Sequence, residues 1–419
     1  MRIALLFTLT FSFAISAAEP DWPTFRGPKR DGLSPDKGLL KSWPTDGPPL
    51  AWKSENVGDG YSSVVVVGDK VITMGDKGDS SYVFAVGRKD GKKIWEAKVG
   101  KSGGGGGYPG PRCTPTVDGN YVYAIGQHGD FVCVALADGK ELWRHNLAKD
   151  FKGSVGSWFF SESPLVDGDK VLCTPGGKEA TMLALDKKSG KALWKGFTPD
   201  GEDAGYSSII AYTGPGGKQY VTLTSKSVVS FAAETGKFLW RYGATGSRFA
   251  DNTANVPSVV LMPATNQLFA SAGYGRGAGL FQISSTGGKM DAKEVYWSDK
   301  LANKHGGIIR VGDYLYGDQD DSGRIWCAEA KSGKVMWSRK DRDEGGGSAS
   351  ITYADGMLYV RYQNGWVSLV SANPKEYQPI STFRISNGSG NCWAHPVVIG
   401  GKFYVREMNT IWCFNVAQK

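Results

Sequence analysis

The sequence predicts an all-β fold: an eight-bladed β-propeller with four antiparallel strands in each blade. Three observations predict it. A tight turn recurs at a mean interval of about 47 residues, the length of one four-stranded blade. A tryptophan follows at the same place in most repeats. The 419 residues include 58 glycines, and glycine and β-branched residues interrupt every segment, which excludes a coiled coil or a helical bundle.

One complete repeat is clearest between residues 160 and 194. The first turn in it, Asp167-Gly168, has the composition of a two-residue β-hairpin loop. Two further turns rich in glycine follow, and the short apolar segments between the turns are predicted as strands. These strands cover residues 163–166, 170–173, 181–186 and 192–194. Four short antiparallel strands joined by three tight turns form one twisted sheet.

The first turn of the repeat recurs eight times along the chain. Its central residues are Gly68-Asp69, Asp118-Gly119, Asp167-Gly168, Pro215-Gly216, Thr265-Asn266, Gly312-Asp313, Asp355-Gly356 and Gly400-Gly401. A tryptophan marks the fourth strand of most units, and Phe383 takes its place in the seventh. Large aromatic side chains favour cores, so we expect these rings to fill the wedges between blades. The predicted structural docking residues are Trp52, Trp95, Trp143, Trp194, Trp240, Trp297 and Trp337.

The two ends of the chain predict how the ring closes. The eighth unit has strands near residues 396–399, 402–406 and 410–414, and the sequence then stops one strand short, at Lys419. Residues 50–53 look like a fourth strand without its preceding turn. We therefore expect this N-terminal strand to complete the last blade, because closure leaves only short, protected sheet edges. The predicted organisation is a signal peptide (1–18), an extended segment (19–49) and a single propeller domain (50–419).

The first residues predict export. Arg2 precedes an apolar and hydroxyl run over residues 3–15, and Ser16-Ala17-Ala18 is a small-residue cleavage site. The run is shorter than the roughly 20 residues of a membrane-spanning helix. No cysteine follows it to carry a lipid anchor. We expect cleavage near Ala18 and a monomeric periplasmic or secreted protein without a membrane span.

The six cysteines are expected to be mostly buried free thiols. They are Cys113, Cys133, Cys173, Cys327, Cys392 and Cys413. Cys113 and Cys133 fall on the predicted first and third strands of one blade, as do Cys392 and Cys413. Such strands lie about 9–10 Å apart, whereas a disulfide needs Cα atoms within about 7 Å.

The formal net charge of +8 does not predict nucleic-acid binding. Single lysines recur after a turn glycine in the successive units, so the repeat distributes them around the molecule. They are Lys92, Lys140, Lys191, Lys237, Lys289 and Lys334. We interpret the charge as a generally basic, solvated surface.

Residues 184–194, Ala-Leu-Asp-Lys-Lys-Ser-Gly-Lys-Ala-Leu-Trp, resemble the tryptophan-docking motif of the pyrroloquinoline quinone (PQQ)-like propeller superfamily. Residues 21–27, Asp-Trp-Pro-Thr-Phe-Arg-Gly, are similar to the start of its exported bacterial members. The resemblance implies an eight-bladed fold. One branch of the superfamily holds PQQ-dependent alcohol dehydrogenases, which use a calcium or lanthanide ion and an aspartate base. Another holds non-catalytic propellers, including the outer-membrane assembly lipoprotein BamB.

Each branch has a feature that this sequence lacks. The dehydrogenases typically carry adjacent cysteines that form a disulfide over the quinone, and no Cys-Cys pair occurs here. The best-known BamB proteins are lipid-anchored, and no anchoring cysteine follows the apolar run. The missing cysteine pair removes part of a catalytic site, whereas the missing anchor changes only tethering.

Ligand-binding residues are expected at one mouth of the channel, near the starts of the innermost strands. The candidates are Arg112, Glu162, Tyr206, Asp251, Asn252, His305, Asn391 and His395. Two interpretations remain open. Glu162, Asp251 and Asn252 carry the oxygens that a calcium-assisted quinone site needs. Alternatively, these residues line a wet channel and cap strand ends. A shift of one residue in the alignment would reverse which side chains face the channel.

Three other patterns carry no predicted activity. Residues 318–323 with Glu329 have the spacing of an EF-hand calcium loop, but strands are predicted on both sides instead of helices. The glycine run at residues 103–107 is interpreted as a flexible loop between blades one and two, since no helix follows to bind phosphate. The four histidines have no close zinc-site spacing.

The sequence therefore predicts an exported, non-catalytic binding or scaffold propeller. No catalytic residue, metal ligand or cofactor is assigned. The expected partners are envelope proteins, in envelope or outer-membrane protein assembly, or a small ligand in the channel. The alternative is a PQQ- and calcium-dependent alcohol dehydrogenase, with PQQ and Ca²⁺ as its cofactors.

Overall fold

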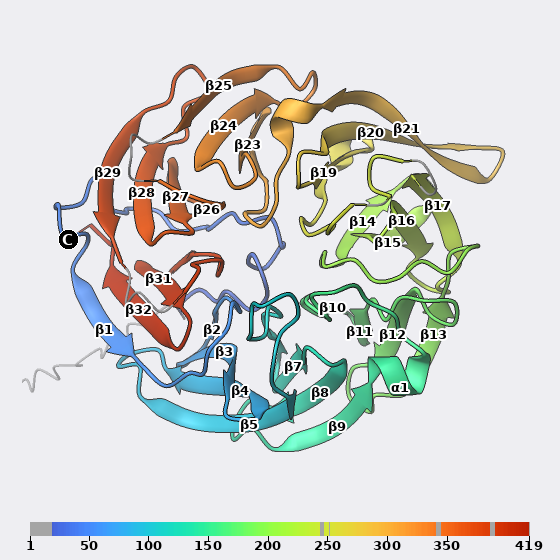
Figure 1. Ribbon diagram of the computed structural model, residues 1–419, viewed down its shortest axis with the longest axis horizontal. Coiled ribbons are helices and arrows are strands. Elements are labelled where there is room, and N and C mark those ends of the chain that lie inside the picture. The colour runs from blue at the N-terminus through green and yellow to red at the C-terminus, as the bar shows by residue number, and fades with distance from the viewer. Residues whose placement is uncertain (1–18, 244–246, 251, 341–344, 386–389, 419) are drawn as a thin grey trace, which may run out of the picture.

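Eight antiparallel four-stranded sheets surround a central channel in the computed structural model (Figure 1). The structure describes residues 19–243, 247–250, 252–340, 345–385 and 390–418. The predicted signal peptide, residues 1–18, lies outside the described residues. Each sheet follows the chain in order from one strand to the next, except the one that joins the two ends. The predicted eight-bladed propeller is confirmed.

The first four blades run, strand by strand, as follows: β2 (Val65–Val67), β3 (Lys70–Lys77), β4 (Ser80–Gly87), β5 (Lys93–Lys101); β6 (Thr116–Asp118), β7 (Tyr121–Ile125), β8 (Asp130–Ala135), β9 (Glu141–Asn146); β10 (Leu165–Asp167), β11 (Lys170–Cys173), β12 (Met182–Asp186), β13 (Ala192–Gly196); β14 (Ile210–Gly214), β15 (Gly217–Leu223), β16 (Ser227–Ala232), β17 (Phe238–Gly243). A short helix, α1 (Leu147–Phe151), follows the second blade.

The last four blades are built in the same way: β18 (Val260–Met262), β19 (Gln267–Ala272), β20 (Gly277–Thr286), β21 (Lys289–Ser298); β22 (Ile309–Val311), β23 (Tyr314–Asp318), β24 (Arg324–Glu329), β25 (Val335–Lys340); β26 (Ala349–Ala354), β27 (Met357–Tyr362), β28 (Trp366–Ser371), β29 (Pro379–Arg384); β30 (Val397–Ile399), β31 (Lys402–Glu407), β32 (Thr410–Asn415), β1 (Leu50–Ser54). Two 3₁₀ turns, η1 (Pro263–Thr265) and η2 (Asp299–Leu301), lie beside the fifth blade.

The N-terminal strand closes the ring, as predicted. β1 pairs antiparallel with β32, and Trp52 lies opposite Cys413 in that register. The last blade therefore has the order β1-β32-β31-β30, with its outer strand supplied by the other end of the chain.

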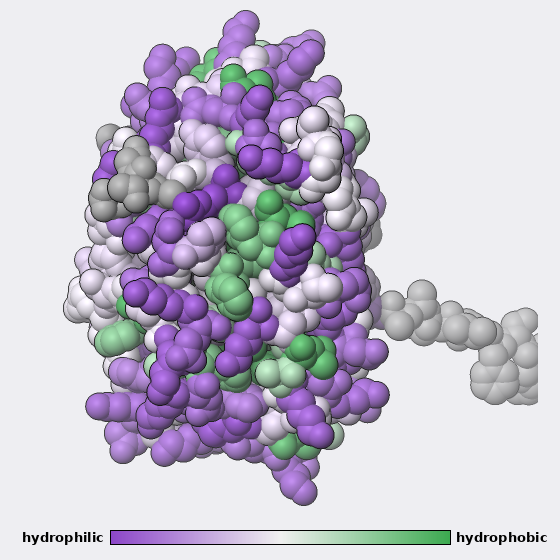
Figure 2. Space-filling model, turned by 90° about the vertical axis from the view of Figure 1, so that its right-hand side faces the viewer, coloured by the Kyte–Doolittle hydropathy of each residue, from purple (hydrophilic) through white to green (hydrophobic). Residues whose placement is uncertain are grey.

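The core lies between the blades. In β8, four successive residues from Phe131 to Val134 are buried, because neighbouring blades cover both faces of a middle strand. The outer strand β13 instead exposes Leu193 and half-buries Trp194. Figure 2 shows one edge of the disc, where hydrophilic side chains surround small apolar patches. The lysines that follow the turn glycines are all exposed.

In most blades, a tryptophan of the outer strand donates a hydrogen bond to the next blade. Trp143 Nε1 donates to the backbone oxygen of Lys187 in the following blade at 3.1 Å. Its ring lies against Gly190, where an added Cβ would meet Trp143 Cδ2 at 2.9 Å. Only glycine combines this contact with the positive φ of +72°. Trp52, Trp95, Trp194 and Trp337 donate to the corresponding turns, at 2.9, 3.1, 3.2 and 2.9 Å.

Three blades depart from this pattern. In the seventh, Phe383 takes the place of the indole, as predicted, and lies against Gly47 without donating a hydrogen bond. Trp240 Nε1 donates to Gln219 Oε1 of its own blade at 2.8 Å. In the fifth blade, Tyr296 makes the contact predicted for Trp297, because its hydroxyl donates to the backbone oxygen of Ala330 at 2.8 Å. Trp297 instead donates to the backbone oxygen of Arg276 at 3.1 Å. The outer strands that carry Trp143 and Trp194 have a register irregularity beside the docking ring, and in β21 the residue at that position is Tyr296.

The six cysteines are free and buried, as expected. Two of them lie outside the strands predicted for them. Cys113 precedes β6 and Cys392 precedes β30, because the first strands of these blades are only three residues long.

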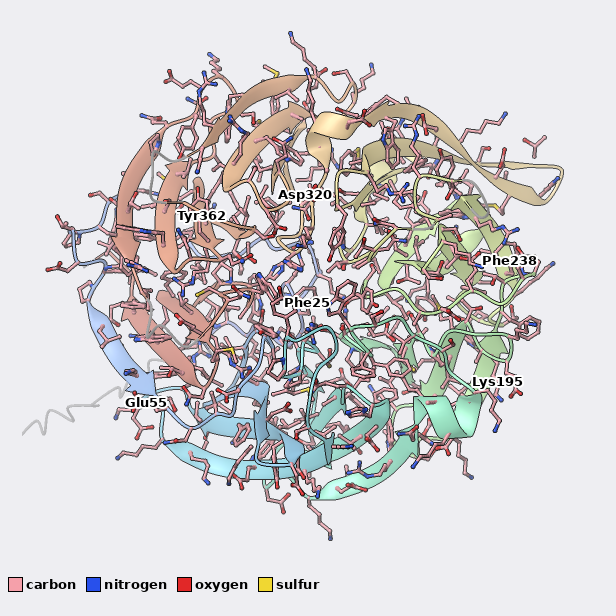
Figure 3. All side chains as sticks on the ribbon, viewed as in Figure 1. Phe25, Glu55, Lys195, Phe238, Asp320 and Tyr362 are labelled. Atoms are coloured by element: carbon pink, nitrogen blue, oxygen red, sulfur yellow. The ribbon has the colours of Figure 1, made fainter. Side chains whose placement is uncertain are left out.

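The segment before β1 passes through the channel and closes it, an arrangement that the sequence did not predict (Figure 1). We call residues 22–36 the N-terminal plug. Trp22 exchanges backbone hydrogen bonds with Val66 of the first blade, and Arg30 donates to the backbone oxygens of Ser163 and Pro164 at 2.7 and 2.8 Å. Further hydrogen bonds join the plug to the second, sixth, seventh and eighth blades. Phe25 lies at the centre of the ring in Figure 3.

Candidate functional site

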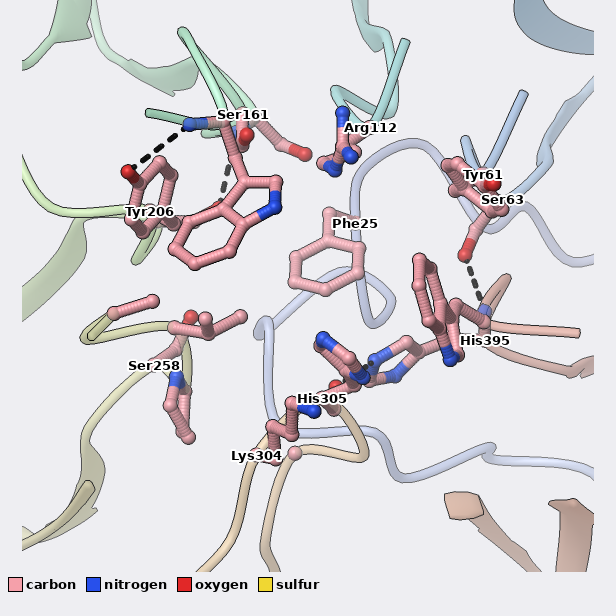
Figure 4. Close-up of a pocket in the computed structure, with 18 of the residues that line it drawn as sticks. Phe25, Tyr61, Ser63, Arg112, Ser161, Tyr206, Ser258, Lys304, His305 and His395 are labelled. Carbon is pink, nitrogen blue, oxygen red and sulfur yellow. Dashed lines mark hydrogen bonds between the residues drawn. The ribbon is translucent and has the colours of Figure 1, made fainter. Parts of the chain in front are cut away.

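A cavity of about 300 Å³ opens at the channel mouth where the innermost strands begin. We call it the mouth cavity. Phe25 of the N-terminal plug lies at its centre in Figure 4, between Arg112, Tyr206 and His305. The cavity is thus a cup, with a floor made by the plug and walls made by the segments that precede the blades. Such a volume suits a small molecule or one side chain of a partner.

Aromatic rings form most of the wall. Trp393 packs against Tyr61 and Tyr108, with ring centroids 4.7 and 5.0 Å apart. Across the cavity, Trp158 stacks on Tyr274 at 6.4 Å and meets Tyr206 edge-on at 5.9 Å. Rings that pack on one another in this way hold flat faces toward a ligand.

The loop that carries Tyr108 contains the glycine run at residues 103–107. An added Cβ at Gly105 would lie 1.7 Å from the backbone oxygen of Ser157, and one at Gly106 would lie 2.5 Å from Trp158 Nε1. The run lies between the first and second blades, as predicted. Its glycines permit a close approach to the loop of the third blade, which places Tyr108 and Trp158 on the same cavity.

Three cationic side chains line the cavity, and no described lining residue is Asp or Glu. Arg112 lies over the ring of Tyr61 at 5.3 Å and donates to the backbone oxygens of Tyr108 and Gly110. Burial lowers the pKa of Arg26 to about 10, so its guanidinium stays charged at neutral pH. Lys304 forms an ion pair with Asp321 at 2.5 Å and lies over the ring of Tyr274 at 4.7 Å.

Hydroxyl side chains connect successive blades around the mouth. The backbone N–H of one blade donates to the hydroxyl of the next, which joins the eighth blade to the fourth through the first, second and third. The four bonds are His395 to Ser63 at 2.7 Å, and Ser63 to Thr114, Thr114 to Ser163 and Ser163 to Ser208 at 3.0 Å each. Each hydroxyl oxygen accepts, so its hydrogen remains able to donate.

Both histidines of the cavity are neutral. Burial lowers the pKa of His305 and of His395 to about 3. His395 Nε2 lies 3.0 Å from the backbone oxygen of His305, and because a carbonyl only accepts, this nitrogen carries the proton. The His305 ring packs on Trp393 at 4.6 Å. These two side chains therefore add polar atoms without adding charge.

The structure brings together four of the eight predicted ligand-binding residues. Arg112, Tyr206, His305 and His395 line the mouth cavity. The side chain of Glu162 is buried away from it and accepts hydrogen bonds from the backbone N–H and hydroxyl of Thr174. Asp251 lies outside the described residues.

Asn252 and Asn391 do not line the cavity either. The amide nitrogen of Asn252 donates to the backbone oxygen of Ala254 at 2.8 Å and to Asn255 at 2.9 Å, so it stabilises its own loop. Asn391 accepts from Gln363 at 3.1 Å.

The lining residues that sequence reasoning missed include Phe25, Arg26, Tyr108, Tyr274 and Lys304. The motif at residues 21–27 was a signal for the first two, since it stands outside the repeat and carries two large side chains. The other three come from loops of unequal length, which the repeat does not place.

The loop with EF-hand-like spacing is flanked by strands β23 and β24, as predicted. Its carboxylates accept from nearby donors: Asp320 from the backbone N–H groups of Tyr274 and Gly275, and Asp321 from Lys304 and Ser348. Within the described part of the chain, no group of three or more His, Cys, Asp or Glu residues is arranged to hold a metal ion. None of the described helices has the length and hydropathy needed to cross a membrane.

Residues 78–339 match the model of a family described as outer membrane protein assembly factor BamB. An outer membrane protein assembly factor BamB of Burkholderia pseudomallei (strain K96243) is 26% identical over 261 residues, which are 60% of this chain and 59% of that protein. The match therefore spans less than two thirds of that relative.

Two further similarities cover more of the chain. A tetrathionate hydrolase of Acidithiobacillus ferrooxidans is 23% identical over 432 residues, with 94% of this chain and 81% of that protein covered. Among solved structures, a europium-containing methanol dehydrogenase superposes with a TM-score of 0.51 at 12% identity, over 92% of this chain and 89% of that one. At that identity, the superposition shows a shared fold and nothing of the activity.

Proposed function

This chain belongs to the family of PQQ-like β-propellers that includes outer membrane protein assembly factor BamB, and we propose that it is a non-catalytic binding protein of the cell envelope. Its ligand occupies the mouth cavity. The observation that carries this proposal is the composition of that cavity, where packed rings, guanidinium groups and hydroxyls meet without a carboxylate among the described lining residues. These groups bind and orient, but they include no charged base to take a proton from a substrate.

The cavity does not fit the calcium-assisted quinone site of the alternative function. A hard cation such as Ca²⁺ takes six to eight oxygen ligands, with carboxylates prominent among them. Glu162 turns toward Thr174, and Asn252 holds its own loop. The cationic groups of Arg26, Arg112 and Lys304 would also repel a calcium ion placed in the cavity. The described residues thus favour a binding protein over an alcohol dehydrogenase.

A turnover assay tests this choice. Purified protein is mixed with PQQ and CaCl₂, and the reduction of an electron-accepting dye is followed on addition of ethanol. We expect no alcohol-dependent reduction above that of a boiled sample. Saturable turnover that is abolished in Glu162→Ala or Asp251→Ala, and retained in the surface variant Lys195→Ala, would contradict the proposal.

The family membership supports a role beside the outer-membrane assembly proteins, which the relatives' name specifies. Envelope extract is passed over immobilised wild-type protein, a mouth variant Trp393→Ala and a rim variant Phe197→Ala. Phe197 is 57% exposed on the outside of the ring, so its loss removes apolar surface away from the mouth. We expect wild type and Phe197→Ala to retain outer-membrane assembly proteins, and Trp393→Ala to lose them. Equal capture by all three would refute the mouth as the binding site.

A further inference from the structure

Arg112 forms no ion pair among the described residues, and the Asp76 carboxylate acts on its charge only from beyond ion-pair distance. Its guanidinium donates to the backbone oxygens of Tyr108 and Gly110, at 3.0 and 3.3 Å, and lies on the face of Tyr61. These contacts use part of the five N–H donors of the guanidinium. The group is held in place by neutral neighbours and points into the mouth cavity in Figure 4.

Arg26 adds a second cation at the floor, and the nearby Asp31 carboxylate offsets part of its charge. Its side chain is 4% exposed, and its guanidinium donates to the backbone oxygens of Asp31 and Ile308. Its Nε has no hydrogen-bond partner among the described residues. A buried cation is unfavourable unless an anion or several acceptors compensate it. Arg26 and Arg112 line the cavity with no carboxylate among its described lining residues, so this lining favours an anionic ligand.

The serine hydroxyls of the cavity wall also favour a negatively charged ligand. Ser63, Ser163 and Ser208 each accept a backbone N–H from the neighbouring blade. None of the bonds found among the described residues uses their hydroxyl hydrogens. The cavity therefore offers many donors and few acceptors, which is the arrangement that recognises an oxyanion.

The rings specify the rest of the ligand. Trp158 and Tyr274 lie at an interplanar angle of 23° on one side, and Tyr61 and Trp393 pack together on the other. Phe25 lies between Tyr61 and Tyr206 in Figure 4. A flat aromatic group can enter such a cup and exchange water contacts for ring contacts. The volume of about 300 Å³ admits one or two fused rings with a short acidic arm.

We propose that the mouth cavity binds an aromatic carboxylate without a metal ion, with the carboxylate on Arg112 and the ring over Phe25. This inference rests on the proposed binding function and names its ligand class. The carboxylate belongs either to a free aromatic acid or to the C-terminal aromatic residue of a polypeptide, because both present the same two groups.

Compounds that share one ring and differ in charge test whether the cavity prefers an anion. Calorimetric titrations in EDTA compare indole-3-acetate, indole-3-acetamide and tryptamine, which share one ring and differ in charge. Acetate supplies the anion without the ring. We expect indole-3-acetate to bind roughly ten- to a hundredfold more tightly than the amide, as one charge-assisted hydrogen-bonded pair provides. Tryptamine and acetate should bind more weakly still. Equal binding of acid and amide, tighter binding of tryptamine, no binding of the acid, or binding that requires added Ca²⁺ would overturn the proposal.

Two variants locate the carboxylate. Arg112→Gln should remove most of the preference for acid over amide, whereas Arg339→Gln, an exposed position on the outer strand β25, should keep it. Thermal unfolding of both variants checks that they fold. Unchanged preference in a folded Arg112→Gln would refute the assignment to Arg112. If that variant does not fold, the comparison of acid and amide on the wild-type protein still decides the proposal.

A peptide Gly-Ser-Gly-Ser-Phe with a free carboxylate, compared with its C-terminal amide, distinguishes the two sources. Binding of the free peptide as tight as that of indole-3-acetate assigns the site to chain termini, and exclusion of the peptide assigns it to free acids. Failure of every acid to bind would leave capture of envelope proteins intact, so this result is distinguishable from failure of the proposed function.

Discussion

The contact between Gly190 and Trp143 predicts how strongly one docking glycine stabilises the ring. In Gly190→Ala, the new Cβ lies 2.9 Å from Cδ2 and 3.0 Å from Cγ of the indole, at a φ of +72°. The left-handed backbone costs an alanine about 1–2 kcal/mol, and overpacking the ring costs about 1–3 kcal/mol more. The free energy of unfolding should therefore fall by roughly 2–5 kcal/mol.

Gly168 provides the matched control in the same blade. Its φ is +60°, and nothing lies within 4 Å of an added Cβ. Gly168→Ala should lose only the backbone contribution, about 1–2 kcal/mol. Urea unfolding followed by tryptophan fluorescence compares the two variants. The extra loss at Gly190 should shrink when Trp143 is also replaced by Leu, because the clash is then removed. Equal losses in the two single variants would refute the docking argument.

Three more outcomes follow from buried polar contacts. Burial raises the pKa of Glu162 to about 7, so the folded protein keeps a proton that the unfolded chain releases near pH 4.5. Stability should fall by about 3 kcal/mol as pH rises between these values, and urea titrations of Glu162→Gln at pH 5 and 8 should show a smaller difference. Tyr296→Phe should cost about 1 kcal/mol in thermal unfolding, and an unchanged midpoint would contradict its bond to Ala330. Arg30→Gln should destabilise by about 1–3 kcal/mol, because it leaves the backbone oxygen of Ser163 without a donor while Pro164 keeps the hydroxyl of Thr116, and its urea midpoint checks this.

The fold was predictable because the repeat is local. Turn glycines at positive φ, such as Gly168 and Gly190, mark the same two corners in blade after blade. Counting the strands then required β1 to complete the last blade, and β1 pairs with β32 as expected. Trp297 shows the limit of this reasoning. Tyr296 occupies the register position that Trp143 and Trp194 occupy in their blades, and a search for the recurring tryptophan selects its neighbour Trp297 instead.

Four of the eight predicted ligand-binding residues do not line the cavity or lie outside the described residues. For one of them, Glu162, the alternation of side chains along the extended backbone is the reason. Ser161 and Ser163 line the mouth cavity, whereas Glu162 between them points to Thr174. Side chains alternate in extended backbone, so an alignment uncertain by one residue cannot tell which of these neighbours faces the channel. The sequence analysis selected Glu162 for its carboxylate, whereas the hydroxyls of Ser161 and Ser163 on either side of it line the cavity.

The residues that form the floor of the cavity could not be predicted from a local sequence pattern. Phe25 and Arg26 reach the channel because the N-terminal plug bonds to six blades, and each of these partners is distant in sequence. The N-terminal plug therefore both connects six blades and supplies the floor on which the proposed ligand rests. A ligand that draws Arg26 upward acts against its bond to Ile308 of the sixth blade, whereas one that rests on Phe25 leaves the plug in place. The second arrangement preserves more hydrogen bonds, which is why the carboxylate is assigned to Arg112 on the wall and the ring to Phe25 on the floor.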